Sequence, residues 1–241
     1  AGKSEELYYG NKPILSDFGT CNKIIAKAAE YSLYSVNNQI VEGFVSVGGG
    51  VRIGLCGEIV RENDGVKTIK NFSSLNIRIP HDVVGCSDKV MPKITVNDKV
   101  VNTLIVSAPG KGKTTMLRDL SRKLSDEDQN VLIIDERNEI CAYNDGKPYF
   151  KTGKNCDVIT FGNKEFAFSY GIRTMSPDVI ITDELMSELD SDAVILAAAG
   201  GVKVIAGVHA GNLNELKSKG YLKKLLSSGL IGRYVFFSGE T

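Results

Sequence analysis

The sequence contains little histidine, no excess of either charge and no long apolar run. Two histidines and five scattered cysteines without a Cys-x-x-Cys pair do not have the spacing of a zinc site or a disulfide framework. Basic and acidic residues balance at 29 each, which counts against a protein that binds mainly nucleic-acid phosphates. Apolar residues nowhere reach the run of about 18 that a membrane helix needs, so we expect a soluble, intracellular protein.

The first part of the chain predicts a small mixed domain. Apolar side chains at helical spacing over residues 21–41 predict one amphipathic helix. Short β-type runs follow, punctuated by glycines, at 44–47, 51–56, 58–60 and 75–79. One helix with a small sheet indicates an α+β domain, which we place at residues 1–94.

The remainder of the chain changes to alternating strands and helices. A helix is predicted over 113–124, and apolar strands are predicted at 103–106, 131–134, 179–182, 202–206 and 234–237. Near-continuous apolar strands of this kind are typical of a mostly parallel sheet that is buried on both faces. We therefore predict an α/β domain over residues 95–241.

The most specific motif follows the first of these strands and opens the helix. It runs Ser107-Ala108-Pro109-Gly110-Lys111-Gly112-Lys113-Thr114, with Thr115 directly behind it. Glycines let main-chain amides point at phosphate oxygens, and the helix N-terminus adds partial positive charge. We expect Lys113 to reach the β- and γ-phosphates of ATP, Thr114 to ligate Mg²⁺ and Thr115 to lie near the α-phosphate. Ser107 stands where the usual pattern has glycine, which requires a backbone angle open to other residues.

The strand at 179–182 ends in the acidic pair Asp183-Glu184. Beside a phosphate loop, Asp183 would hold Mg²⁺ and Glu184 would orient the water that attacks the γ-phosphate. The alternative for Asp183 is a helix cap at the surface. Because one strand separates the loop strand from this strand in sequence, we expect a P-loop core of the RecA-like type.

The strand at 131–134 also ends in acid, at Asp135-Glu136, and continues to Glu139. Ligands of open α/β sheets bind at the carboxyl edge of the strands, so Glu136 or Glu139 could share water activation or contact Mg²⁺ through its water shell. A charged loop without a catalytic role is the alternative. His209, at the end of the strand at 202–206, could sense the γ-phosphate and relay hydrolysis to a neighbouring subunit, or be a structural residue.

These motifs together resemble the type II/type IV secretion ATPase superfamily over residues 95–240. The resemblance rests on the phosphate loop, the acidic box 135–139, the segment 172–184 and the histidine box 208–210. Segments 51–58, 74–79 and 117–120 are further similar to the sporulation stage III protein AA family. This chain departs from the secretion enzymes in carrying Asp183-Glu184 where they usually have Gly-Glu.

The resemblance implies a cytoplasmic ATPase of the mother cell, peripheral to the membrane through partner proteins. It implies a homo-oligomeric ring, a hexamer, that powers assembly of, or transport through, the mother-cell-to-forespore channel. It also implies that arginines complete the nucleotide site, and the matching residues are Arg52 and Arg78 of the first domain and Arg173 of the second. Two alternatives stay open: a ring scaffold that binds ATP with negligible turnover, and a RecA-like nucleic-acid translocase.

Overall fold

The computed structural model describes residues 8–9, 12–13, 18–29, 36–62, 65–79, 81–144, 147–160 and 163–237. The chain forms two compact units, residues 1–80 and 81–241. The boundary predicted at residue 94 is therefore too late. The reason is visible in the core of the second unit, where Val90 and Ile94 are buried against its sheet and helices.

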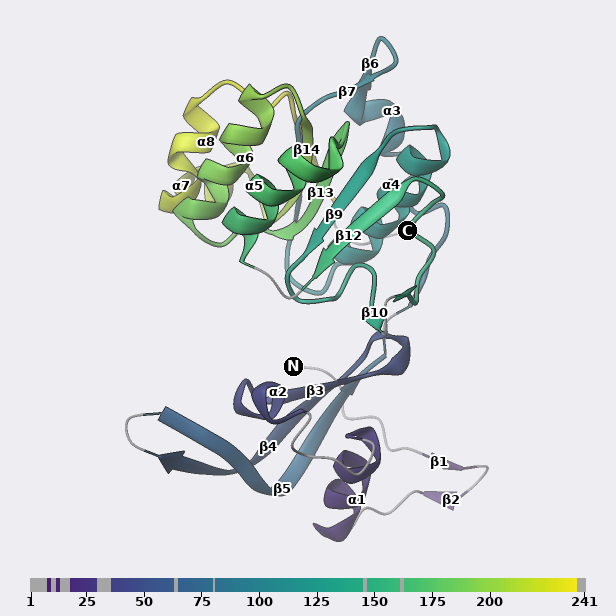
Figure 1. The fold of residues 1–241 in the computed structure, drawn as a ribbon, viewed down its shortest axis with the longest axis vertical. Helices are drawn as coiled ribbons and strands as arrows, with labels where there is room; N and C mark the ends of the chain where they lie inside the picture. Colours follow the sequence, from purple (N-terminus) through teal and green to yellow (C-terminus); the bar gives the residue numbers. More distant parts are fainter. Residues whose placement is uncertain are drawn as a thin grey trace. The chain divides into compact units, whose positions relative to one another are not determined.

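The first unit is built on a three-stranded antiparallel sheet with the order β3-β4-β5 (Figure 1). Helix α1 (Phe18–Ala28) places Ile25 against this sheet, where it forms a small core with Ile53 and Phe72. The strands are β3 (Phe44–Val47), β4 (Val51–Glu62) and β5 (Gly65–Arg78). The other elements are β1 (Tyr8–Tyr9), β2 (Lys12–Pro13), α2 (Asn37–Val41) and the 3₁₀ turn η1 (Gly48–Gly50).

Two details of this unit differ from the sequence prediction. The single helix expected over 21–41 is two helices, α1 and α2, and residues 30–35 lie outside the described part. The runs at 51–56 and 58–60 are one long strand, β4, whose register against β5 shifts near Gly57. A Cβ on Gly57 would lie 2.6 Å from the carbonyl oxygen of Lys70, so this irregularity requires glycine.

The second unit contains a six-stranded sheet in which every neighbouring pair is parallel. Its order is β12-β9-β13-β14-β8-β15. The strands are β8 (Thr103–Ser107), β9 (Val131–Asp135), β12 (Cys156–Thr160), β13 (Val179–Glu184), β14 (Lys203–His209) and β15 (Arg233–Phe236). The predicted α/β class and parallel sheet are confirmed, and β14 lies between the loop strand β8 and the acidic strand β13.

Alternate residues of each central strand supply the cores on the two faces of this sheet. Leu104 and Leu132 point to one face, and Ile105 and Ile133 to the other. Helices α5 (Lys164–Met175), α6 (Glu188–Ala199), α7 (Leu213–Ser218) and α8 (Lys223–Ser227) contribute to the first core. Helix α4 (Lys113–Asp126) and the short α3 (Met91–Ile94) contribute to the second. Burial on both faces explains why the central strands are apolar throughout.

Strand β12 and helix α5 do not follow from the sequence pattern used above. β12 is the edge strand beyond β9, and it is only partly buried. A polar residue, Asp157, interrupts its apolar run, which removes the signal of a buried strand. Smaller elements complete the unit: β6 (Thr95–Val96), β7 (Lys99–Val100), β10 (Tyr143–Asn144), β11 (Lys147–Pro148) and η2 (Gly220–Leu222).

The parallel sheet brings the polar residues that end its central strands to one edge. Because the strands run in the same direction, their last residues lie along the carboxyl edge of the sheet. These residues are Ser107, Asp135, Glu184 and His209. Within the part of the chain that the structure describes, none of the helices has the length and apolar character needed to span a bilayer.

Candidate functional site

The phosphate-type loop joins β8 to α4 at this edge. Gly110 and Gly112 adopt positive φ values of 74° and 88°, which glycine reaches without strain. Gly112 is the N-cap of α4, and having no side chain it leaves the first-turn amides of the helix uncapped. Ser107 ends β8 in strand conformation, so serine fits where the usual pattern has glycine. The loop therefore presents free main-chain donors at a positive helix end, as anion binding requires.

Lys113, His209 and Glu184 form a chain of polar contacts beside the loop. The Lys113 ammonium lies 3.4 Å from His209 Nε2, and the same ring nitrogen lies 3.3 Å from Glu184 Oε2. Lys113 is buried, and burial lowers the pKa of its ammonium while Glu184 and Asp183 act to raise it. These contacts connect the ends of β13 and β14 to the first turn of α4.

The His209 ring can take two hydrogen-bonding states in this position. Its Nδ1 lies 3.3 Å from the carbonyl oxygen of Ser107. When Nδ1 carries the only proton, that N–H donates to Ser107 and Nε2 accepts from Lys113. When both nitrogens are protonated, Nε2–H donates to Glu184 instead. His209 can therefore exchange between the phosphate-loop lysine and the acidic strand end.

Gly207 makes room for the Lys113 side chain. It lies in β14 opposite the end of β13, where the register between these strands shifts. A Cβ at this position would lie 2.3 Å from the carbonyl oxygen of Asp183 and 2.9 Å from Cδ of Lys113. Any larger residue would displace the lysine or the acidic strand end. Gly207 was not among the predicted site residues, although a glycine inside an apolar strand is a signal of close approach.

Lys164 is a second buried cation in the site, and it was not among the predicted site residues. Its Nζ lies 2.7 Å from Glu136 Oε2 and 2.9 Å from Asp183 Oδ1. Burial acts to lower the pKa of Lys164, but Asp183 and Glu136 outweigh it and raise the pKa, so the ammonium stays charged. Lys164 is the first residue of α5, and the strand before this helix, β12, was not predicted. Without that strand, the sequence does not indicate that Lys164 lies at the carboxyl edge of the sheet.

Asp183 is buried with an incomplete set of hydrogen bonds. The distance to Lys164 is that of an ion pair, yet neither carboxylate oxygen makes a well-directed hydrogen bond within the described residues. Burial raises the pKa of Asp183, and Lys164 opposes this. Two such oxygen atoms, near a loop that ends in the Thr114 hydroxyl, fit a divalent cation that also binds phosphate oxygens. Among the residues described, no three acidic, histidine or cysteine side chains form a metal cluster by themselves.

Asp135 organises the acidic box. Its carboxylate accepts hydrogen bonds from the main-chain amides of Glu139, Ile140 and Cys141 at 2.8–2.9 Å. Burial raises its pKa to about 6, against the effect of these donors. The fully buried Arg118 supports the same turn by donating to the carbonyl oxygens of Glu139 and Ile140. The backbone of the acidic box is therefore fixed from both sides.

The two glutamates of the box take different positions. Glu136 pairs with Lys164, whereas Glu139 is close enough to Lys113 to act on the pKa of that lysine. Arg137, between them, lies 3.7 Å from Glu184 Oε2 and 3.0 Å from the Met186 sulfur. Glu184 thus lies within 4 Å of Arg137 and His209, and it is also close enough to Lys113 to act on the pKa of that lysine. The acidic-box pattern over 135–139 gives no role to Arg137.

The predicted arginines do not join this cluster within the second unit. Arg173 lies in the last turn of α5, where its Nε donates to the carbonyl oxygen of Ser169. The chain continues from this turn to the first residue of β13, whereas the acidic pair lies at the last residues of that strand. Arg52 and Arg78 belong to the first unit, where they are paired directly across β4 and β5. Residues directly opposite each other on antiparallel strands extend from the same face of the sheet. Arg52 also lies 3.6 Å from the centre of the Phe44 ring.

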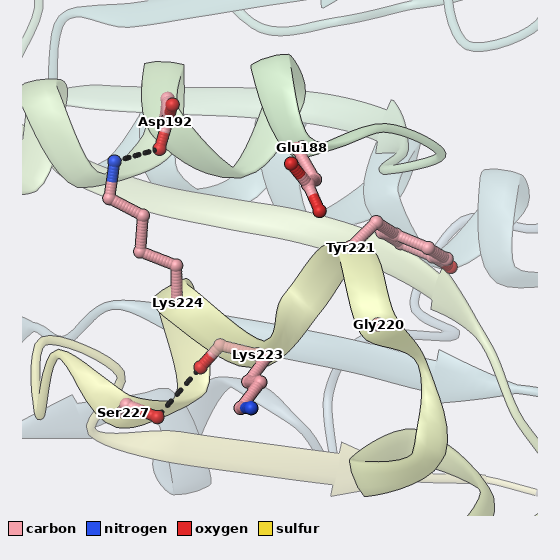
Figure 2. A pocket seen from close by; sticks show the side chains of 7 residues that line it. All are labelled: Glu188, Asp192, Gly220, Tyr221, Lys223, Lys224 and Ser227. Atoms are coloured by element: carbon pink, nitrogen blue, oxygen red, sulfur yellow. Dashed lines mark hydrogen bonds and ion pairs between the residues drawn. The ribbon is translucent and has the colours of Figure 1, made fainter.

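A hollow of about 430 Å³ lies elsewhere in the second unit (Figure 2). It is bounded by α6 on one side and by η2 and α8 on the other. Figure 2 shows Lys224 directed at Asp192, and their charged atoms are 2.6 Å apart. The other lining residues are Glu188, Gly220, Tyr221, Lys223 and Ser227. No residue predicted from the sequence motifs lines this hollow, and we assign it no role.

Comparison with known proteins gives the family. The sequence profile of the family described as "Sporulation stage III, protein AA" matches residues 3–241. The chain belongs to this family. Stage III sporulation protein AA of Bacillus subtilis (strain 168) is 36% identical to it over 242 residues, which cover 97% of this chain and 78% of the Bacillus protein.

Two solved structures share this fold. The ATPase DotB of Legionella pneumophila matches this sporulation-family chain with a TM-score of 0.52 and 17% identity, over 95% of this chain and 61% of DotB. The pilus retraction motor PilT, solved with bound ADP, matches with a TM-score of 0.55 and 18% identity, over 89% and 59%. This chain thus spans about three fifths of the length of either structure. At these identities the likeness shows the fold.

Proposed function

We propose that this chain is an ATP-hydrolysing, ring-forming ATPase of the secretion type that powers assembly of, or transport through, the mother-cell-to-forespore channel in sporulation. The family membership supports the sporulation context, and the fold supports the secretion type. The observation that carries the proposal is the meeting of Lys113, Glu184 and His209 beside an uncapped helix N-terminus. An anion bound there would displace Lys113 from His209.

In this proposal the main-chain amides of the loop and Lys113 bind the terminal phosphates of ATP. Thr114 and Asp183 would hold Mg²⁺, which when bound neutralises charge on the β- and γ-phosphates. Glu184 orients and polarises the attacking water. Once Lys113 turns to phosphate, His209 Nε2 no longer accepts from that lysine and, when it carries a proton, donates to Glu184, which links the occupancy of the loop to the position of the catalytic carboxylate. Glu139, near Lys113, is better placed than Glu136 to assist.

The arginines extend the proposal to more than one chain. In the secretion ATPases that this chain resembles, arginines of the N-terminal domain complete the nucleotide site. Arg52 and Arg78 are the matching residues of this chain, and they lie opposite each other on β4 and β5. Arg173 is held at the other end of α5 from Lys164, so we give it no part in the site of its own chain. A site that needs arginines from a neighbour works only in an assembled ring, for which the resemblance implies six subunits.

The proposal is tested by measuring ATP turnover of the full chain against protein concentration. Turnover per chain is expected to rise as rings assemble and to be nearly absent when the protein is dilute. Glu184→Gln should bind ATP with parent affinity and lower turnover by a factor of about 10² or more, because only water activation is removed. Lys113→Ala should weaken ATP binding itself.

The control is Lys111→Ala in the same loop, since Lys111 is exposed and has no part in the contacts described above. It should keep most of the turnover. Parent turnover in Glu184→Gln would refute the assignment of the catalytic carboxylate. Stoichiometric ATP binding with no turnover at any protein concentration would favour the ring scaffold instead.

A further inference from the structure

Lys164 occupies a position that is unfavourable for a lysine. It is the first residue of α5, directly after the N-cap Asn163, where the helix dipole disfavours positive charge. Its side chain is only 3% exposed, and burial of a charged group is costly unless the group is paired. Departures from local preference of this kind are expected at functional sites. The reason for this one must lie in the two carboxylates that the ammonium contacts.

Those carboxylates come from neighbouring strands. Asp183 is part of β13, and Glu136 follows the last residue of β9, which pairs with β13 in parallel. Lys164 lies within 3 Å of an oxygen of each, at 2.7 Å from Glu136 and 2.9 Å from Asp183. The three groups carry a net charge of −1. Without the lysine, the buried Asp183 carboxylate, whose oxygens lack hydrogen bonds within the described residues, would lie beside the half-exposed Glu136 with no cation between them, and Mg²⁺ is usually held by one or two protein carboxylates.

We propose that Lys164 is a positioning residue that fills the space between Asp183 and Glu136, so that this acidic pair takes up a divalent cation only when nucleotide adds its phosphate oxygens. The inference rests on the proposed role of Asp183 at the magnesium site. Mg²⁺ is normally bound through one or two carboxylates together with substrate phosphates. The ammonium ensures this order of assembly, because it neutralises one carboxylate and fixes the distance between the strand ends.

Binding of Mn²⁺ to the full chain in the absence of nucleotide tests the proposal. Mn²⁺ replaces Mg²⁺ as an oxygen-seeking cation, and its free form is measured by electron paramagnetic resonance. Lys164→Met, which keeps the apolar stem and removes the charge, should bind Mn²⁺ about tenfold more tightly than the parent. Lys164→Arg, which restores the charge, and the double variant Lys164→Met/Asp183→Asn, which removes the carboxylate, should bind as weakly as the parent.

A structural role alone would lower the stability of Lys164→Met without creating a cation site. Equal Mn²⁺ affinity of folded Lys164→Met and the parent would therefore overturn the proposal. Should Lys164→Met fail to fold, Glu136→Gln provides the second measurement. It leaves the lysine with Asp183 alone, so the Mg²⁺ concentration for half-maximal ATP binding should rise several-fold, and an unchanged value would overturn the proposal.

The Mn²⁺ measurement contains no nucleotide, so it is independent of the proposed ATPase activity. A parent protein that binds no ATP would refute the proposed function, while the Mn²⁺ affinities would still decide the role of Lys164. Conversely, active parent protein with unaltered Mn²⁺ binding in Lys164→Met would refute the lysine proposal alone.

Discussion

The two units of the chain differ in how fully their sheets are covered. The six-stranded sheet of the second unit has buried cores on both faces, so the strand ends that carry the candidate site are held rigidly. The three-stranded sheet of the first unit has a small core around Ile25, and large apolar side chains such as Ile59 and Ile77 are about half exposed. The second unit contains the phosphate-type loop and the acidic strand ends, and the first contains Arg52 and Arg78 opposite each other on β4 and β5.

The largest effect that tests this division concerns the arginines. The double variant Arg52→Ala/Arg78→Ala should lower turnover by a factor of about 10² or more while ATP affinity changes little, because the loop lies in the other unit. Lys113→Ala is expected to be inactive because it lacks the lysine of its own nucleotide site, but it keeps both arginines. Mixing the two variants should therefore restore part of the activity when both enter one ring. Steady-state ATPase assays of each variant and of their mixture check this.

Arg61→Ala is the matched control, since Arg61 is an exposed arginine of the same strand, β4, as Arg52. It should leave turnover unchanged. Full activity in the double arginine variant would show that the arginines of the first unit have no part in catalysis. No recovery of activity in the mixture would show that these arginines do not act on the site of a neighbouring chain.

The cores give a second, smaller contrast. Phe72→Ala in the first unit and Leu132→Ala in the second each remove a buried side chain, at about 2–5 kcal/mol of stability. We expect Phe72→Ala to lower the unfolding temperature of the first unit while ADP binding persists. Leu132→Ala should weaken ADP binding at the same temperature, because its strand ends in the acidic box. Calorimetry with and without ADP distinguishes these outcomes, and joint unfolding of both units in both variants would contradict the division.

The smallest effect concerns the segment at which the second unit begins. The Ser87 amide and hydroxyl donate to Asp119 Oδ2 at 2.8 and 2.6 Å, and Arg122 contacts Oδ1 at 2.7 Å. Burial acts to raise the pKa of Asp119, but the hydrogen bonds from Ser87 and Arg122 outweigh it and lower the pKa from 3.8 to about 2. Because the folded-state pKa is depressed, the ionised carboxylate stabilises the fold above about pH 4, and this contribution is lost as the pH falls towards 2.

Asp119→Asn should therefore lose about 2 kcal/mol of unfolding free energy at pH 7. The difference from the parent should shrink between pH 4 and pH 2, where the parent carboxylate also becomes neutral. Urea unfolding across this range measures it. A difference that stays constant with pH would show that the hydrogen bonds of Asp119 do not depend on its charge.

The sequence predicts the second unit better than the first for a physical reason. Buried parallel strands must be apolar throughout, so 103–106, 131–134 and 179–182 were recognisable from composition. The phosphate loop combines glycines with a strand before it and a helix behind it, and few other structures require that combination. In the first unit, short runs broken by glycine did not reveal that β4 continues through Gly57. The domain boundary was misplaced because 81–94 contributes to the core by long-range packing, which has no local signature.

Part of the candidate site was also beyond sequence reasoning. The predicted ends of the strands indicate which residues lie at the carboxyl edge of the sheet. They do not indicate which carboxylate forms an ion pair with which cation. The pairing of Glu136 with Lys164 depends on the edge strand β12, whose polar residue hides it, and on the start of the helix that follows. The contact of Arg137 with Glu184 likewise depends on the turn that Asp135 and Arg118 hold in place. Such contacts are set by tertiary packing.

Equilibrium binding of ATP to the purified chain in the presence of Mg²⁺ tests the central claim most directly. The proposed site predicts saturable binding well below millimolar ATP, and affinity at least about tenfold weaker in Lys113→Ala than in the parent. Absence of ATP binding by the parent at millimolar concentration, or equal affinity in Lys113→Ala, would contradict the claim that the loop before α4 holds the nucleotide phosphates.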